Sequence, residues 1–347
     1  MKVGLFDHIE YGDRPIAQLF DERLEFIKAA DDAGFYCLHL AEHHQTPLNM
    51  VPVPGVFMGA AARMTRRIRI GPLVYLLPVV SPLRMIDEIC MLDHLSHGRA
   101  EIGVGRGVSP FELKYNKVDP EKSRDIFIDA YRCISRGLTT DALTYKGPYY
   151  EYENVPIALS PYQKPFPPFW YGSSGDEGSA WAGEEGLHFV TLGPNASARA
   201  NIDTFKKALA KRGKPAQPKP EFSGGVALGV QRHIFVDETD DKAHAWARPA
   251  MNKHLEHINW IRTRHGVTAT QARIRSTRGA NYDECLEEGT VIAGSPATVL
   301  KSIERHAKEI GFNYLLAYLF LGNMPFDTAM RSLKLFINDV MPAVERM

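Results

Sequence analysis

Short apolar runs alternate with amphipathic segments along almost the whole chain. In residues 16–33, Leu19, Leu24 and Ile27 recur at helical spacing, and Gly34 follows where helices commonly end. The other segments with a helical pattern are 56–64, 83–95, 119–137, 181–185 and 325–345. The apolar runs predicted as strands are 2–7, 35–40, 68–74, 99–104, 168–171, 187–192, 226–236 and 313–321.

Eight strands that alternate with helices are typical of a parallel α/β fold. We therefore predict a single (β/α)8 TIM barrel over residues 1–347, although periodicity alone leaves an open doubly wound sheet as the alternative. Residues 248–288 form a long, polar and poorly periodic insertion before the last βα unit. Long connections of this kind are usually lids or disordered segments. We predict a lid, mobile until ligands bind, and a surface insertion that makes subunit contacts is the alternative.

The composition of the 347 residues narrows the class of partner. Lysine plus arginine equals aspartate plus glutamate at 41 each, so no overall field attracts nucleic acid or a membrane surface. No apolar stretch reaches the roughly 18 residues that a membrane span requires, and the first strand begins without a leader pattern. The four cysteines stand far apart and suggest reduced thiols. We expect a cytoplasmic protein.

Glu42, His43 and His44 come directly after the second predicted strand. A (β/α)8 barrel carries its chemistry at the C-terminal ends of its strands, so these side chains are candidates for catalysis. A polar patch that caps the strand is the alternative. His39 and His43 are four residues apart, but on a strand rather than on the helix of a zinc HExxH motif, so we expect no metal site.

The loop after the fourth predicted strand, residues 103–107, has glycine at every second position around Arg106. It matches neither GxGxxG nor a P-loop. A flexible backbone beside one guanidinium suits a phosphate grip. A tight turn with a surface arginine is the alternative.

The loop after the fifth predicted strand contains Ser173, Ser174 and Gly175 and leads into a helix. Free N–H groups at a helix N-terminus, with serine hydroxyls beside them, form an anion site. An ordinary helix cap is the alternative. In a barrel, the ends of strands two, four and five share one face, so the histidines and both loops are expected around one cavity.

Taken together, these motifs resemble those of the bacterial luciferase-like family of flavin-dependent monooxygenases. The resemblance runs nearly end to end and rests on residues 40–44, 71–78, 81–84, 92–99, 103–107 and 336–342. It implies a (β/α)8 barrel that binds reduced FMN as a diffusible co-substrate. O2 then adds to the flavin C4a carbon, and the resulting (hydro)peroxide oxygenates a small organic substrate. It also implies a separate NAD(P)H:flavin reductase, and we further expect a homodimer.

The resemblance assigns roles to the candidate residues. His43 supports the chemistry beside the flavin ring, and Glu42 and His44 orient it. Arg106 binds the flavin phosphate, together with a second loop that holds Ser173, Ser174 and Gly175. Leu73-Val74 corresponds to a non-prolyl cis peptide beneath the isoalloxazine.

One departure and three alternatives accompany this interpretation. Gly105 stands where the light-emitting subunit carries a reactive cysteine, which argues against light emission. A deazaflavin-dependent oxidoreductase of the same superfamily would transfer hydride without O2. A non-catalytic flavin-binding relative would not need His43. A metal-dependent barrel hydrolase is the remaining alternative.

Overall fold

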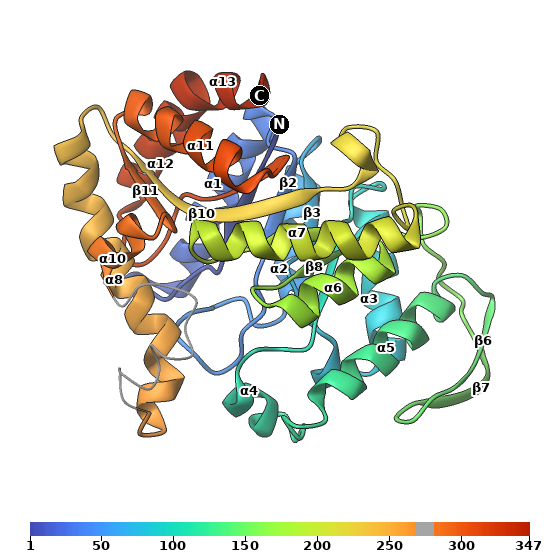
Figure 1. The fold of residues 1–347 in the computed structure, drawn as a ribbon. Coiled ribbons are helices and arrows are strands. Elements are labelled where there is room, and N and C mark those ends of the chain that lie inside the picture. The colour runs from blue at the N-terminus through green and yellow to red at the C-terminus, as the bar shows by residue number, and fades with distance from the viewer. Residues whose placement is uncertain (268–280) are drawn as a thin grey trace.

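The structure is a computed structural model that describes residues 1–267 and 281–347, and its centre is a parallel sheet rolled into a barrel (Figure 1). The neighbouring strands run in the order β3-β2-β1-β12-β10-β9-β8-β5-β4. Their bounds are β1 Lys2–Asp7, β2 Cys37–Leu40, β3 Arg69–Pro72, β4 Tyr75–Leu76, β5 Ile102–Gly105, β8 Phe169–Gly172, β9 His188–Thr191, β10 Leu228–Val236 and β12 Tyr314–Tyr318.

The barrel closes through β3 and β4, which stand where one strand was predicted over residues 68–74, although β4 begins just beyond that range. β3 pairs with β2, β4 pairs with β5, and an isolated bridge joins Ile70 to Ala100. Counted as one strand, β3 and β4 bring the barrel to the eight strands expected from the sequence. The (β/α)8 fold class is therefore confirmed, and the open doubly wound sheet is excluded.

Helices surround the barrel, as Figure 1 shows. Their bounds are α1 Ile16–Ala33, α2 Pro54–Met64, α3 Pro82–Leu95, α4 Pro110–Tyr115, α5 Ser123–Gly137, α6 Asp176–Glu185, α7 Asn195–Arg212, α8 Asp240–Arg264, α10 Tyr282–Glu287, α11 Pro296–Ile310, α12 Phe326–Leu335 and α13 Met341–Glu345. Shorter turns are η1 Leu77–Val79, η2 Ser223–Gly225 and η3 Phe336–Val340. The predicted bounds of α1 are correct, because Gly34 ends the helix at φ 92° and donates its N–H to Ala30 and Asp31.

Several elements were absent from the prediction. β6 (Ala142–Lys146) and β7 (Glu151–Pro156) form an antiparallel hairpin that projects from the barrel in Figure 1. β11 (Val291–Gly294) pairs with the outer part of β10. These runs are short or mostly exposed, so their apolar pattern is weak.

The expectation of an irregular segment at 248–288 is wrong for its first part. Residues 248–264 continue α8 and bury Ala250, His254 and Ile261. Near the end of the 248–288 segment, α10 buries Tyr282 and Cys285. Residues 268–280 lie outside the described residues, so the function of the segment as a lid stays a prediction. The pattern is weak because His254 and His257 share the buried face of α8 with alanines and only a few large apolar side chains.

Since all barrel strands are parallel, their C-terminal ends open at the same side of the molecule. The loops that follow β1, β2, β5 and β8 therefore meet there. Among the described helices, none combines the length and the hydropathy needed to cross a membrane.

Candidate active site

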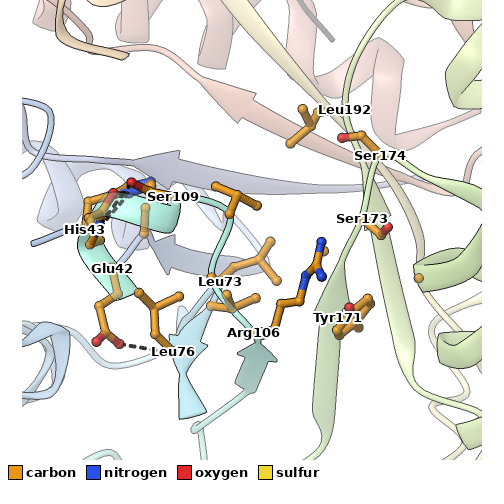
Figure 2. A pocket seen from close by; sticks show the side chains of 18 of the residues that line it. Glu42, His43, Leu73, Leu76, Arg106, Ser109, Tyr171, Ser173, Ser174 and Leu192 are labelled. Atoms are coloured by element: carbon orange, nitrogen blue, oxygen red, sulfur yellow. Dashed lines mark hydrogen bonds and ion pairs between the residues drawn. The ribbon is translucent and has the colours of Figure 1, made fainter. Parts of the chain in front are cut away.

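A cavity of about 630 Å³ lies at the C-terminal ends of the strands. Of the nine residues proposed from the sequence, eight line it: Glu42, His43, Leu73, Val74, Arg106, Ser173, Ser174 and Gly175. His44 lies directly behind them. Figure 2 shows His43 at one end and Arg106, Ser173 and Ser174 at the other, with Leu73 between. The expectation that the three motifs share one cavity is confirmed.

The imidazole of His43 is held by a residue that the sequence analysis did not identify. Its Nδ1 lies 3.2 Å and 3.3 Å from the two carboxylate oxygens of Glu112, in the first turn of α4. The same carboxylate accepts the backbone N–H of His44 at 2.9 Å. Burial disfavours the ionised form of Glu112, but the charge and hydrogen bond of His43 outweigh burial and hold the Glu112 pKa below its usual value. An ionised Glu112 fixes the proton of His43 on Nδ1 and leaves Nε2 for chemistry.

Glu42 and His44 pair with each other. His44 Nε2 lies 2.8 Å from Glu42 Oε1, and this hydrogen bond raises the pKa of His44. The other Glu42 oxygen accepts the backbone N–H of Leu76 at 3.0 Å. The side chain that orients the His43 ring is Glu112, and Glu42 connects the exit of β2 to the start of β4.

Between the two ends of the cavity, the chain bends at Leu73-Val74. This peptide bond is cis and does not involve proline, as the resemblance implied. Val74 packs against Gly105 of β5 so closely that a Cβ at position 105 would overlap its Cγ2. A side chain at Gly103 would likewise meet the backbone of Pro72 and Leu73. Gly103 and Gly105 therefore leave room for the backbone and side chains of Leu73 and Val74.

The opposite end of the cavity gathers groups that suit an anion. Arg106 follows β5, and Ser173, Ser174 and Gly175 precede the first turn of α6. Arg124 of α5, which the sequence analysis missed, also lines this end and pairs with Glu177 at 2.8 Å. Two guanidinium groups and the N-terminus of a helix are a donor set for phosphate.

Over residues 1–267 and 281–347, no group of three or more His, Cys, Asp or Glu side chains is placed to hold an ion. The four cysteines are free thiols, and all four are buried.

Glu112 and Arg124 line the cavity but were not predicted, and only Glu112 has a recognisable signal in the sequence. Ser109 caps α4 and accepts the N–H of Glu112, the S-x-x-E spacing of a capping box. That signal places Glu112 in the first helical turn, but it does not indicate the pairing with His43. For Arg124 the sequence contains no comparable signal.

Residues 1–314 match the sequence model of the family described as luciferase-like monooxygenase. The chain is 33% identical over 344 residues to the uncharacterized protein y4wF of Sinorhizobium fredii, covering 99% of this chain and 97% of that protein. It is 24% identical over 363 residues to the flavin-dependent trigonelline monooxygenase, oxygenase component, of Acinetobacter baylyi, covering 99% and 95%. Among solved structures, the oxygenating constituent of 3,6-diketocamphane monooxygenase from Pseudomonas putida, in complex with FMN, matches with a TM-score of 0.80 at 20% identity, covering 99% and 98%.

Proposed function

The chain belongs to the luciferase-like monooxygenase family, and we propose that it is the oxygenase component of a two-component system. In this proposal it uses reduced FMN and O2 to oxygenate a small organic substrate. The observation that carries the proposal is the cavity with two unlike ends. A carboxylate-oriented imidazole stands at one end, and an arginine beside a helix N-terminus stands at the other.

FMN fits this arrangement. A cavity of about 630 Å³ is within the usual range of ligand and cofactor sites. Arg106, Ser173, Ser174 and the first N–H groups of α6 would hold the phosphate. Leu73 and Val74 line the middle of the cavity, where the apolar ring system would rest. Bound reduced FMN supplies the electrons that activate O2.

The residues of the chain handle the proton. With Nδ1 directed to Glu112, the Nε2 of His43 can accept a proton from, or donate one to, a group in the cavity. Ile258 and Ile261 of α8 line the same cavity and exclude water from part of it. His43 is thus proposed as the general acid–base group, with Glu112 as the residue that positions it.

A separate flavin reductase is part of the proposal. The sequence contains no dinucleotide-binding fingerprint, because the 103–107 loop lacks the third glycine of GxGxxG. The A. baylyi relative is itself named an oxygenase component. A homodimer and a cytoplasmic location also stay predictions, and sedimentation of the purified protein tests the first.

The test supplies the purified protein with chemically reduced FMN and 18O2, together with a panel of apolar ketones, phenols and N-heterocycles. Mass spectrometry should detect a product that contains one atom of 18O. Binding titrations with reduced FMN and with a reduced deazaflavin run in parallel. Hydride transfer from the deazaflavin without O2 would support the alternative oxidoreductase, and binding of neither cofactor would contradict both functions.

A further inference from the structure

A second histidine stands beside His43 in the cavity wall. His8 follows β1, lines the cavity and is only 5% exposed. Its ring stacks on that of His43, with centroids 5.5 Å apart and planes 25° apart. β1 and β2 are neighbouring parallel strands, which explains why their exits meet. A ligand that reaches the His43 ring is therefore within reach of His8 as well.

Behind His8 lies a fully buried carboxylate. Oε1 of Glu10 accepts hydrogen bonds from His254 Nδ1 at 2.8 Å, from the Tyr318 hydroxyl at 2.8 Å and from the Gly322 N–H at 3.0 Å. Its Oε2 accepts from His257 Nδ1 at 2.8 Å. Burial opposes ionisation of Glu10, but the charge of His254 and the hydrogen bonds of His254 and His257 outweigh burial and hold the pKa of Glu10 well below its usual value.

This cluster continues to the cavity wall. The rings of His254 and Tyr318 lie 5.6 Å and 5.5 Å from the ring of His8. His254 also hydrogen bonds through Nε2 to Nε2 of His233 on β10, at 3.2 Å. His8 is thus packed between His43 on the cavity side and rings whose positions Glu10 fixes. Ring contacts with His43, His254 and Tyr318 therefore restrict the orientation of the His8 imidazole.

Apolar side chains also stand on the same side of the cavity as His8. Phe6 contacts its ring edge-on at 5.0 Å, and Leu48, Ile258 and Ile261 line the cavity on neighbouring segments. Ile258 and Ile261 belong to α8, and Glu10 accepts hydrogen bonds from His254 and His257 of the same helix. A mainly apolar wall with a few fixed polar groups is the usual form of a specific ligand site.

We propose that His8 is a further substrate-contacting residue, which hydrogen bonds an oxygen function of a mainly apolar substrate, and that Glu10 positions it through His254. The proposal rests on the proposed function in assigning this end of the cavity to the substrate. His43 handles the proton, and His8 selects substrates that bring a hydroxyl or carbonyl group to the same wall. A site built to hydrogen bond such a group discriminates against an analogue that lacks it.

The test compares phenol with toluene, two probes of equal shape that differ by a hydroxyl in place of a methyl group. Their dissociation constants are measured from ring 1H–15N signals of histidine-labelled protein, with and without FMN. The His8 signal is assigned by its loss in His8→Phe, a variant that keeps an aromatic ring against His43. Wild type should bind phenol roughly two- to tenfold more tightly than toluene, the scale of one neutral hydrogen bond.

His8→Phe should bring the ratio of the two affinities close to one while toluene still binds. Glu10→Gln should reduce the ratio in part. His306→Phe, a matched replacement of a histidine that is buried in α11 and does not line the cavity, should leave the ratio unchanged. A purely structural role for His8 would weaken both probes together and would not move this ratio.

Three results would overturn the proposal. The ratio persists in His8→Phe, the ratio disappears only in His43→Phe, or neither probe binds wild type. Because the ratio is also measured without FMN, a protein that shows it but never binds FMN would contradict the proposed function and leave His8 as a ligand contact.

Discussion

His43 and Glu112 are 69 residues apart in the chain, and the imidazole Nδ1 of one lies 3.2 Å from the carboxylate of the other. The first residue follows β2, and the second belongs to the first turn of α4. The backbone N–H of His44 binds the same carboxylate, which ties the α4 turn to the β2 exit. Glu112 thus sets both the tautomer and the direction of the candidate catalytic ring.

Replacement of His43 by alanine should remove catalysis and spare the cofactor. The side chain lies at the end of the cavity opposite Arg106, so FMN affinity should change little (Figure 2). Loss of a general acid–base group commonly costs about 100-fold or more in rate. Initial rates with saturating reduced FMN and the substrate found in the 18O screen measure the effect. An unchanged rate would exclude His43 from the mechanism.

Glu112→Gln keeps the size of the side chain but removes its charge. We expect FMN binding to persist and the oxygenation rate to fall by roughly tenfold or more, because the His43 ring loses its charged acceptor. Glu121→Gln, an exposed neighbour in the sequence, is the control. Equal oxygenation rates for wild type and Glu112→Gln would contradict the positioning role.

The same carboxylate should also contribute to acid stability. The pKa of Glu112 is lower in the folded protein than its ordinary value of 4.5. Its contribution to the free energy of unfolding is therefore present above pH 4.5 and is lost as the pH falls through the folded pKa. Urea unfolding of wild type and Glu112→Gln at neutral pH and near pH 4 measures it. The difference between the two proteins should shrink on acidification, and a constant difference would refute the assignment.

Arg106→Ala should discriminate between two flavins. Only FMN carries a phosphate, so its affinity should fall roughly tenfold to a hundredfold while that of riboflavin hardly changes. Fluorescence titration with both ligands provides the comparison. Arg132→Ala, which removes an exposed arginine on α5, should affect neither. Equal losses for FMN and riboflavin would place Arg106 away from the phosphate.

Gly105→Ala tests the close packing beneath the proposed flavin site. The new methyl group would overlap Val74 Cγ2, so Leu73 and Val74 must move. We expect weaker binding of FMN and riboflavin alike, because Leu73 and Val74 would contact the ring system rather than the phosphate. Gly59→Ala on α2 is the control, since Gly59 does not line the cavity and a Cβ there would meet only Leu95, at 3.7 Å. An unchanged affinity for both flavins in Gly105→Ala would show that Leu73 and Val74 do not contact the ring system.

Local patterns in the sequence predicted the barrel strands and residues at both ends of the cavity, but they left an open doubly wound sheet as the alternative. Helical spacing followed by a glycine gave α1 its bounds, because the αL cap at Gly34 depends only on nearby residues. His43 and Arg106 could be assigned to one cavity because the C-terminal ends of parallel strands share a face. The break between β3 and β4 was not predicted, since the apolar residues Leu73 and Val74 continue the pattern between Pro72 and Tyr75.

The partners of the site residues were decided by tertiary structure alone. Glu112 reaches His43, and Glu10 reaches His254 across 244 positions, only because α4 and α8 pack over the mouth of the barrel. In sequence, the buried face of α8 is hard to recognise, since His254 and His257 interrupt its apolar residues. His254 and His257 can be buried because the carboxylate of Glu10, far away in the sequence, accepts a hydrogen bond from each. Hydrophobic periodicity does not indicate such a partner.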